Sequence, residues 1–187
     1  MNMRACGRTI TITLLTALLT ALGSLLPLVA STAQQAAHPV ERSATATIQI
    51  SGDVPHPLTL SAADIQAMPR HTIRASEHGQ PESSYDGVAL RDVLARAGVT
   101  FGASLHGPAL ATYVMCSAAD GYRVVFTLAE LDSAFSDRPA FLVDRKDGQP
   151  LDAHSGPFRI VIPGDARPAR WIRQVTAIAV VRPPDRP

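Results

Sequence analysis

The sequence is poor in cysteine and lysine, and neither sign of charge dominates it. It has 2 cysteines in 187 residues: Cys6 lies near the start and Cys116 in the main part of the chain. One cysteine in the main part cannot form an intramolecular disulfide there. It cannot supply a cysteine-rich zinc or iron–sulfur site either, and His71, His106 and His154 lack the short paired spacing of zinc ligands. The composition therefore excludes a disulfide framework and these metal sites.

The formal charge is close to zero. The chain has 17 basic and 16 acidic residues, a net charge of +1. Without its first 33 residues it loses two arginines, and 15 basic residues against 16 acidic ones give −1. This balance favours neither nucleic acid nor an anionic membrane as a partner. Lys146 is the only lysine. The preference for arginine indicates a GC-rich genome at most positions, or forked recognition of phosphate and oxyanions at some of them.

The first 33 residues have the parts of an export signal. Arg4 and Arg8 precede the mostly apolar run 10–30, and Ser31-Thr32-Ala33 fits the small-x-small pattern of a peptidase site. We therefore expect 1–33 to be a cleaved signal peptide, and the product to be periplasmic or secreted with no membrane span. The alternative is an uncleaved anchor, since the apolar run approaches the ~20 residues that cross a bilayer.

The remaining chain has the length of one domain. Residues 34–44 are polar and irregular, which predicts a flexible lead-in, and the proline-rich 183–187 is predicted to be a disordered tail. Residues 45–182 are long enough to form a hydrophobic core. They mix short predicted strands with short predicted helices, which indicates an α+β fold with mixed or antiparallel strands.

Local patterns place the elements of this domain. Alternating or β-branched runs predict strands at 45–50, 71–75, 112–117, 122–126, 140–144, 158–162 and 175–181. Capping residues and apolar spacing predict short helices: one opened by the Ser61–Asp64 box, one over 90–97 that stops at Gly98, and one over 128–131 capped by Thr127. Asp120-Gly121 and Asp147-Gly148 are predicted turns, the second between strands 140–144 and 158–162, and Glu77–Ser84 a polar loop. Tyr122, Val124 and Phe126 are expected to pack on one strand face.

Several segments, in order, resemble the molybdopterin-binding domain of the sulfite oxidase family. The first is Pro57–Leu60 with Met68-Pro69, and the second is Tyr85–Leu94, which is similar to the family's GVPL helix. The third is Asp120–Trp171, with its runs DGYRVV, DRKDGQPL and GPFRIVIPGDARPARW. Together they cover about 48–181. The resemblance implies that family's fold, a molybdopterin cofactor, and oxygen-atom transfer coupled to electron transfer.

The resemblance also implies where the cofactor would bind. The segment that matches 156–171 forms part of the family's pterin pocket. The candidate cofactor-binding residues are therefore Gly156, Arg159, Gly164, Arg167 and Arg170. We expect the three arginines to border one anion-accepting hollow near Gly164. The alternative is structural: Arg159 on a solvent-facing strand side, Gly164 at a strand end, and Trp171 as a core residue.

The family's molybdenum-ligating cysteine follows the second strand, where this chain has Ala75 or Ser76. Serine is a harder ligand that rarely ionises, and the apolar strand around Cys116 predicts a buried core residue. We therefore assign no metal site and expect that molybdenum is not held in the family's usual way. The candidate catalytic residues are Ser76 and His78, which would face a metal. In the polar loop, Glu77 and His78 are either an acid–base pair or simply solvated.

Two functions follow from these expectations. The first is an exported component of this oxidoreductase family that transfers oxygen atoms or electrons. The alternative is a cofactor-free periplasmic binding or accessory module with the same fold. The partner would be a small-molecule ligand or a periplasmic redox protein. The missing cysteine favours the second function as far as catalysis is concerned.

Overall fold

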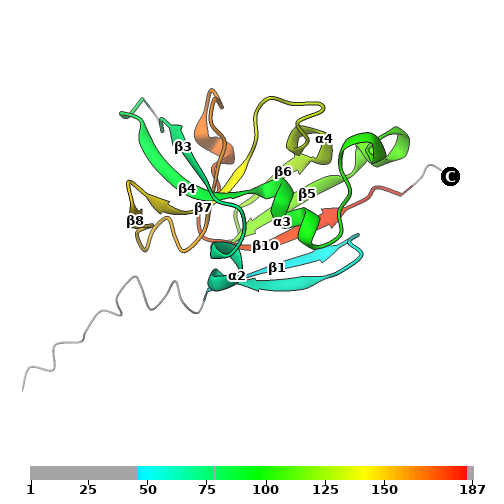
Figure 1. Ribbon diagram of the computed structural model, residues 1–187, viewed down its shortest axis with the longest axis horizontal. Coiled ribbons are helices and arrows are strands. Elements are labelled where there is room, and N and C mark those ends of the chain that lie inside the picture. The colour runs from blue at the N-terminus through cyan, green and yellow to red at the C-terminus, as the bar shows by residue number, and fades with distance from the viewer. Residues whose placement is uncertain (1–45, 78, 185–187) are drawn as a thin grey trace, which may run out of the picture. The chain divides into compact units, whose positions relative to one another are not determined.

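The computed structural model describes residues 46–77 and 79–184. The predicted signal peptide, the predicted lead-in and His78 lie outside these residues. Within them the chain forms ten strands in two five-stranded sheets, with three α-helices and three 3-10 helices (Figure 1). The predicted α+β class is confirmed.

The first sheet contains both the first and the last strand of the domain. Its order is β2-β1-β10-β5-β6, with β1 parallel to β10 and the other neighbours antiparallel. Val114 and Cys116 of β5 are buried, and they pair with the buried Val180 and Ile178 of β10. Alternate residues thus form the core face, as expected for a half-buried sheet. The bounds are β1 Thr47–Gly52, β2 Leu58–Ser61, β5 Tyr113–Ala118, β6 Arg123–Thr127 and β10 Val175–Val181.

The second sheet has the order β3-β4-β7-β8, and β9 also pairs with β7. β3 and β4 run together as a ribbon beside β8 in Figure 1. Gly87 lets β4 approach β7 closely, because a Cβ there would lie 2.3 Å from the Leu142 carbonyl oxygen. All three residues of β9 are buried, and one of them is Arg159. The bounds are β3 His71–Ala75, β4 Ser83–Ala89, β7 Phe141–Lys146, β8 Gln149–Pro150 and β9 Arg159–Val161.

Short helices connect the strands. Ser61 with Asp64, and Thr127 with Glu130, form complete capping boxes, so two predicted helix starts are confirmed. The α-helices are α2 Ala62–Gln66, α3 Leu90–Arg96 and α4 Leu128–Leu131. The 3-10 helices are η1 Gly102–Ser104, η2 Gly107–Ala111 and η3 Pro168–Arg170. Across 46–77 and 79–184, no helix has the length and apolar character needed to cross a membrane.

Three strands were missed, and two predictions about local structure were wrong. β2, β4 and β8 were not predicted, and Ser83 and Ser84 belong to β4 rather than to a loop. The predicted turn at Asp147-Gly148 forms, but the short strand β8 follows it before β9. Tyr122 does not pack with Val124 and Phe126, because it precedes β6 and is 51% exposed. Its hydroxyl donates instead to the Ala169 carbonyl at 2.9 Å.

Candidate functional site

The loop after β3 holds no thiol. Ala75 ends the strand and is buried, and the Ser76 hydroxyl donates to the Gln80 carbonyl at 2.5 Å. Ser76 is therefore tied to its own loop, and it lines neither of the two hollows described next. The side chain of the next loop residue, Glu77, extends to Arg159, whose Nη2 donates to Oε1 at 2.6 Å.

Arg159 is the buried cation at the centre of this region. Its side chain is 5% exposed, against 28% for Glu77. Its guanidinium carbon lies 5.6 Å from the ring centroid of Trp171, which favours the charge through the ring face. Trp171 packs edge-on against Tyr85. The structural alternative for Arg159, a place on a solvent-facing strand side, is therefore wrong, while Trp171 is both a core residue and part of the site.

Two buried hydrogen-bond donors lie unpaired at this position. The Nε of Arg159 and the indole Nε1 of Trp171 have no partner among the described residues. A buried donor without a partner costs about 1–3 kcal/mol. Buried unsatisfied groups are rare in native proteins, and a ligand or ion that satisfies them is one recognised explanation.

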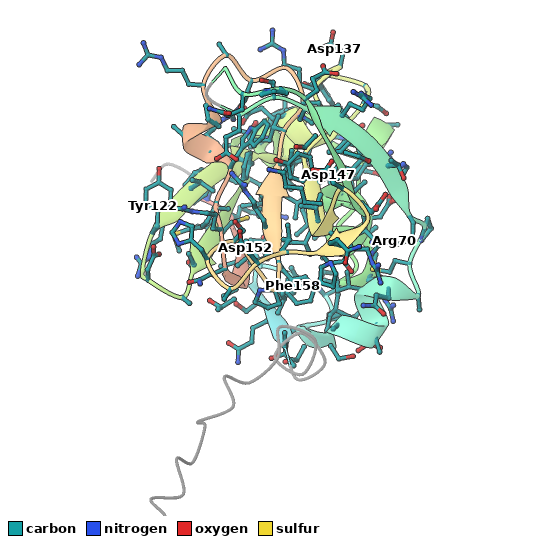
Figure 2. The ribbon with its side chains drawn as sticks, turned by 90° about the vertical axis from the view of Figure 1, so that its left-hand side faces the viewer. Arg70, Tyr122, Asp137, Asp147, Asp152 and Phe158 are labelled. Carbon is teal, nitrogen blue, oxygen red and sulfur yellow. The ribbon has the colours of Figure 1, made fainter. Side chains whose placement is uncertain are left out.

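Two hollows meet at Arg159. The first, of about 260 Å³, is lined among others by Asp120, Tyr122 and Trp171. The second, of about 400 Å³, is lined by Lys146, Asp147, Asp152 and His154 with their neighbours. Glu77, Arg159 and Arg173 border both. Figure 2 looks onto the side of the domain where Tyr122 marks the first hollow and Asp147 and Asp152 mark the second. We call this region the Arg159 site.

Arg170 lies in a different hollow. Its guanidinium already donates to both oxygens of Asp165 and to Glu130, so it has little capacity to bind a further anion. Hydrogen bonds to Asp165 and then to Glu130 raise the pKa of Arg170. Its carbon lies 5.3 Å from the Phe126 ring centroid, at the edge of a third hollow of about 580 Å³. Arg170 therefore fastens the segment after β9 to α4.

The other predicted cofactor residues are placed less centrally. Arg167 is exposed between Gly164 and η3, and neither it nor Gly164 lines the described hollows. Gly156 serves close packing, because a Cβ there would lie 2.9 Å from the Leu151 Cβ. Among the described hollows, the three arginines do not share one. The structure brings Arg159 together with Arg173 instead.

The donor set of the Arg159 site does not suit molybdenum. Over 46–77 and 79–184, no three His, Cys, Asp or Glu residues gather in a way that could hold a metal ion. The one thiol in that part of the chain, Cys116, is fully buried, and burial raises its pKa to about 12. A soft metal needs an ionised, reachable sulfur. Neither Cys116 nor the hydrogen-bonded Ser76 supplies one. His78, the other candidate catalytic residue, lies outside the described residues.

The comparison with family models decides the ancestry. The model of the oxidoreductase molybdopterin binding domain matches residues 35–186. The chain belongs to this family. A solved structure with the same fold is the sulfane dehydrogenase SoxCD from Paracoccus pantotrophus, with 21% sequence identity and a TM-score of 0.59. The match covers 74% of this chain but 38% of that chain, so this member of the molybdopterin-binding family spans well under half of that relative. No curated protein matches the sequence.

Sequence reasoning missed part of the Arg159 site. It gave Glu77 a role only as an acid–base residue or a solvated one, and it gave Trp171 only a core role. Asp120 and Lys146 were not assigned to the site at all. The signal that could have found Trp171 was present, since this residue follows the GPFRIVIPG run that carries the family resemblance.

Proposed function

We propose that this chain is an exported member of its family that binds a small organic ligand at the Arg159 site and performs no molybdenum-centred catalysis. The observation that carries the proposal is the loop after β3, where the strand ends at Ala75 and Ser76 donates to Gln80. A thiolate at this place would anchor the metal, and none is within the described loop.

Binding is supported by what remains at the site. The unpaired donors of Arg159 and Trp171 need acceptors, and the two adjoining hollows leave room for a molecule that supplies them. Small-molecule sites combine apolar or aromatic walls with a few polar groups that fix orientation. Trp171 and Tyr122 provide aromatic surface at the first hollow, and Arg159 provides the polar group.

The metal content of the purified protein tests the catalytic half of the proposal. We expect elemental analysis to find far less than one molybdenum per chain, even in a host that makes the cofactor. Cys116→Ala is the matched variant, and it should leave this result unchanged. Stoichiometric molybdenum that survives Cys116→Ala would contradict the proposal and point to Ser76. Stoichiometric molybdenum that this variant loses would show that Cys116 is the ligand.

Export is a separate expectation with its own measurement. The basic start, the apolar run and Ser31-Thr32-Ala33 predict removal of the first 33 residues on export. Mass spectrometry of protein from a periplasmic extract should therefore find Gln34 at the N-terminus. Intact Met1 in a membrane fraction would favour an uncleaved anchor instead.

A further inference from the structure

We propose that Glu77 occupies the place of a ligand's anionic group, and that the ligand is a small organic anion whose carboxylate or phosphate displaces Glu77 from Arg159. This inference rests on the proposed binding function of the Arg159 site and names the chemical class of the ligand. It follows from the way Glu77 pairs, from the charges around it, and from the burial of the two partners.

Glu77 is an incomplete partner for Arg159. One hydrogen bond of 2.6 Å joins its Oε1 to Nη2, while Nε of the same guanidinium stays unpaired. The Nε and Nη2 groups of an arginine form an edge that two oxygens of one carboxylate or phosphate can accept from together. A free ligand oxyanion that is not restrained by a loop can take both positions. It would also bring oxygens to the neighbouring indole N–H of Trp171.

Charge determines which ligands can make this exchange. A buried guanidinium left without an anion is strongly destabilising, on the order of 3–5 kcal/mol for a broken buried pair. A neutral ligand that displaced Glu77 would leave Arg159 in that state, whereas an anionic ligand replaces one charge with another. The exchange therefore selects anions.

The other carboxylates around the two hollows are engaged differently. Each accepts a hydrogen bond from a backbone N–H: Asp120 from Tyr122, Asp147 from Ser84, and Asp152 from Ser155. These bonds fix local turns, and none of them neutralises the buried cation. Arg173 and Lys146 add positive charge at the border of the hollows. Glu77 is thus the carboxylate whose departure gives an incoming anion its place.

The unequal burial of the pair indicates which partner moves. The side chain of Arg159 is 5% exposed and its backbone is held within β9, so Arg159 stays in place at the border of the two hollows. Glu77 is 28% exposed and lies on the loop between β3 and β4. A rotation of its side chain toward water would restore the hydration of its carboxylate. The first hollow, of about 260 Å³, limits the ligand to a small molecule.

Trp171 supplies a specific readout, since the chain has one tryptophan. Its single indole N–H signal in a nitrogen–proton correlation spectrum should shift when an acceptor arrives. We would titrate the protein with benzoate and with phenyl phosphate, and use benzamide as the neutral match. Both anions, or the one with the better geometry, should shift the signal, and benzamide should not. The stronger of the two anions identifies carboxylate or phosphate as the preferred group.

Glu77→Gln is the decisive variant. It removes the competing charge, so the anion should bind about tenfold more tightly, which corresponds to about 1.4 kcal/mol. Glu82→Gln is the matched control, because Glu82 pairs with the exposed Arg74 and lines neither hollow. It should leave the affinity unchanged. If Glu77→Gln does not fold, Glu77→Asp provides the test, since its shorter side chain pairs less well with Arg159 and should give a smaller gain.

The outcomes separate the two proposals. In one outcome the anions shift the indole signal of the native protein clearly, yet bind the Glu77 variants no more tightly. That result overturns the displacement of Glu77 but leaves the proposed binding function standing. Equal shifts with benzamide overturn the anionic class. If no probe shifts the indole signal in the native protein or in any variant, both the exchange and the proposed function of the site are overturned.

Discussion

Arg159 is a cation inside a strand in which every residue is buried. Moving a guanidinium out of water costs several kcal/mol unless an anion and further hydrogen bonds compensate. Glu77 supplies the anion and the Trp171 ring face adds a favourable contact. The compensation is incomplete, because Nε remains unpaired. An apolar residue would fill this strand position at lower cost, so the presence of the charge supports the binding role proposed for Arg159.

Cys116 is the residue whose role can be tested most directly. Its side chain is exposed neither to solvent nor to a hollow. Its exposure is 0%, and it pairs with Ile178 and Val124 of the neighbouring strands. We expect no labelling of the native protein by a thiol reagent, because burial raises the pKa of the thiol to about 12. Labelling should be fast in denaturant. Cys116→Ala should cost on the order of 1 kcal/mol in chemical unfolding, and rapid labelling of the native protein would contradict a core role.

Helices and turns of this domain were predictable because their signals are local. The Ser61 and Thr127 capping boxes place two helix starts within four residues, and both form as predicted. The Asp120-Gly121 turn closes the hairpin of β5 and β6. Two strands, β3 and β10, were found with their predicted bounds. In each case the residues that determine the structure lie next to one another in the chain.

Strands that depend on distant partners were missed. β8 has two residues, one of them Pro150, and it exists only by pairing with β7. β4 begins with Ser83-Ser84 and contains Gly87, so its sequence has the composition of a loop. Gly87 is required by the closeness of β7, which no local pattern reveals. The site follows the same rule: Glu77 and Arg159 are 82 residues apart, and their pairing depends on the whole fold.

At the scale of the whole molecule, the Arg159 site is assembled from the loop after β3, from β9 and from the segment between η3 and β10. Because these segments come from distant parts of the chain, the site exists only while both sheets are folded. Ligand binding should therefore stabilise the domain as a unit, by an amount that grows with the logarithm of the ligand concentration over its dissociation constant.

Two carboxylates near α4 contribute to the change of stability with pH. Asp132 is 1% exposed, and hydrogen bonds from the backbone N–H groups of Gly102 and Ala134 hold its pKa below the ordinary 3.8. Burial alone would raise the pKa of Glu130, but the Thr127 N–H and Arg170 outweigh it and keep the pKa below 4.5. Both groups bind protons more weakly in the folded chain than in the unfolded chain. Their contribution to stability is therefore complete above those ordinary values and is lost as the pH falls through the lower, folded ones.

Thermal unfolding followed by circular dichroism should thus show a midpoint that is steady from neutral pH to about pH 5 and then falls steeply. Asp132→Asn should lower the midpoint at neutral pH, because the amide carries no charge for the two N–H groups to stabilise, and it should flatten the acidic fall. Asp137→Asn is the matched control, since Asp137 is an exposed carboxylate of the same loop. A midpoint that rises on acidification, or an Asp132→Asn profile parallel to the native one, would show that these hydrogen bonds do not control the acid stability of the domain.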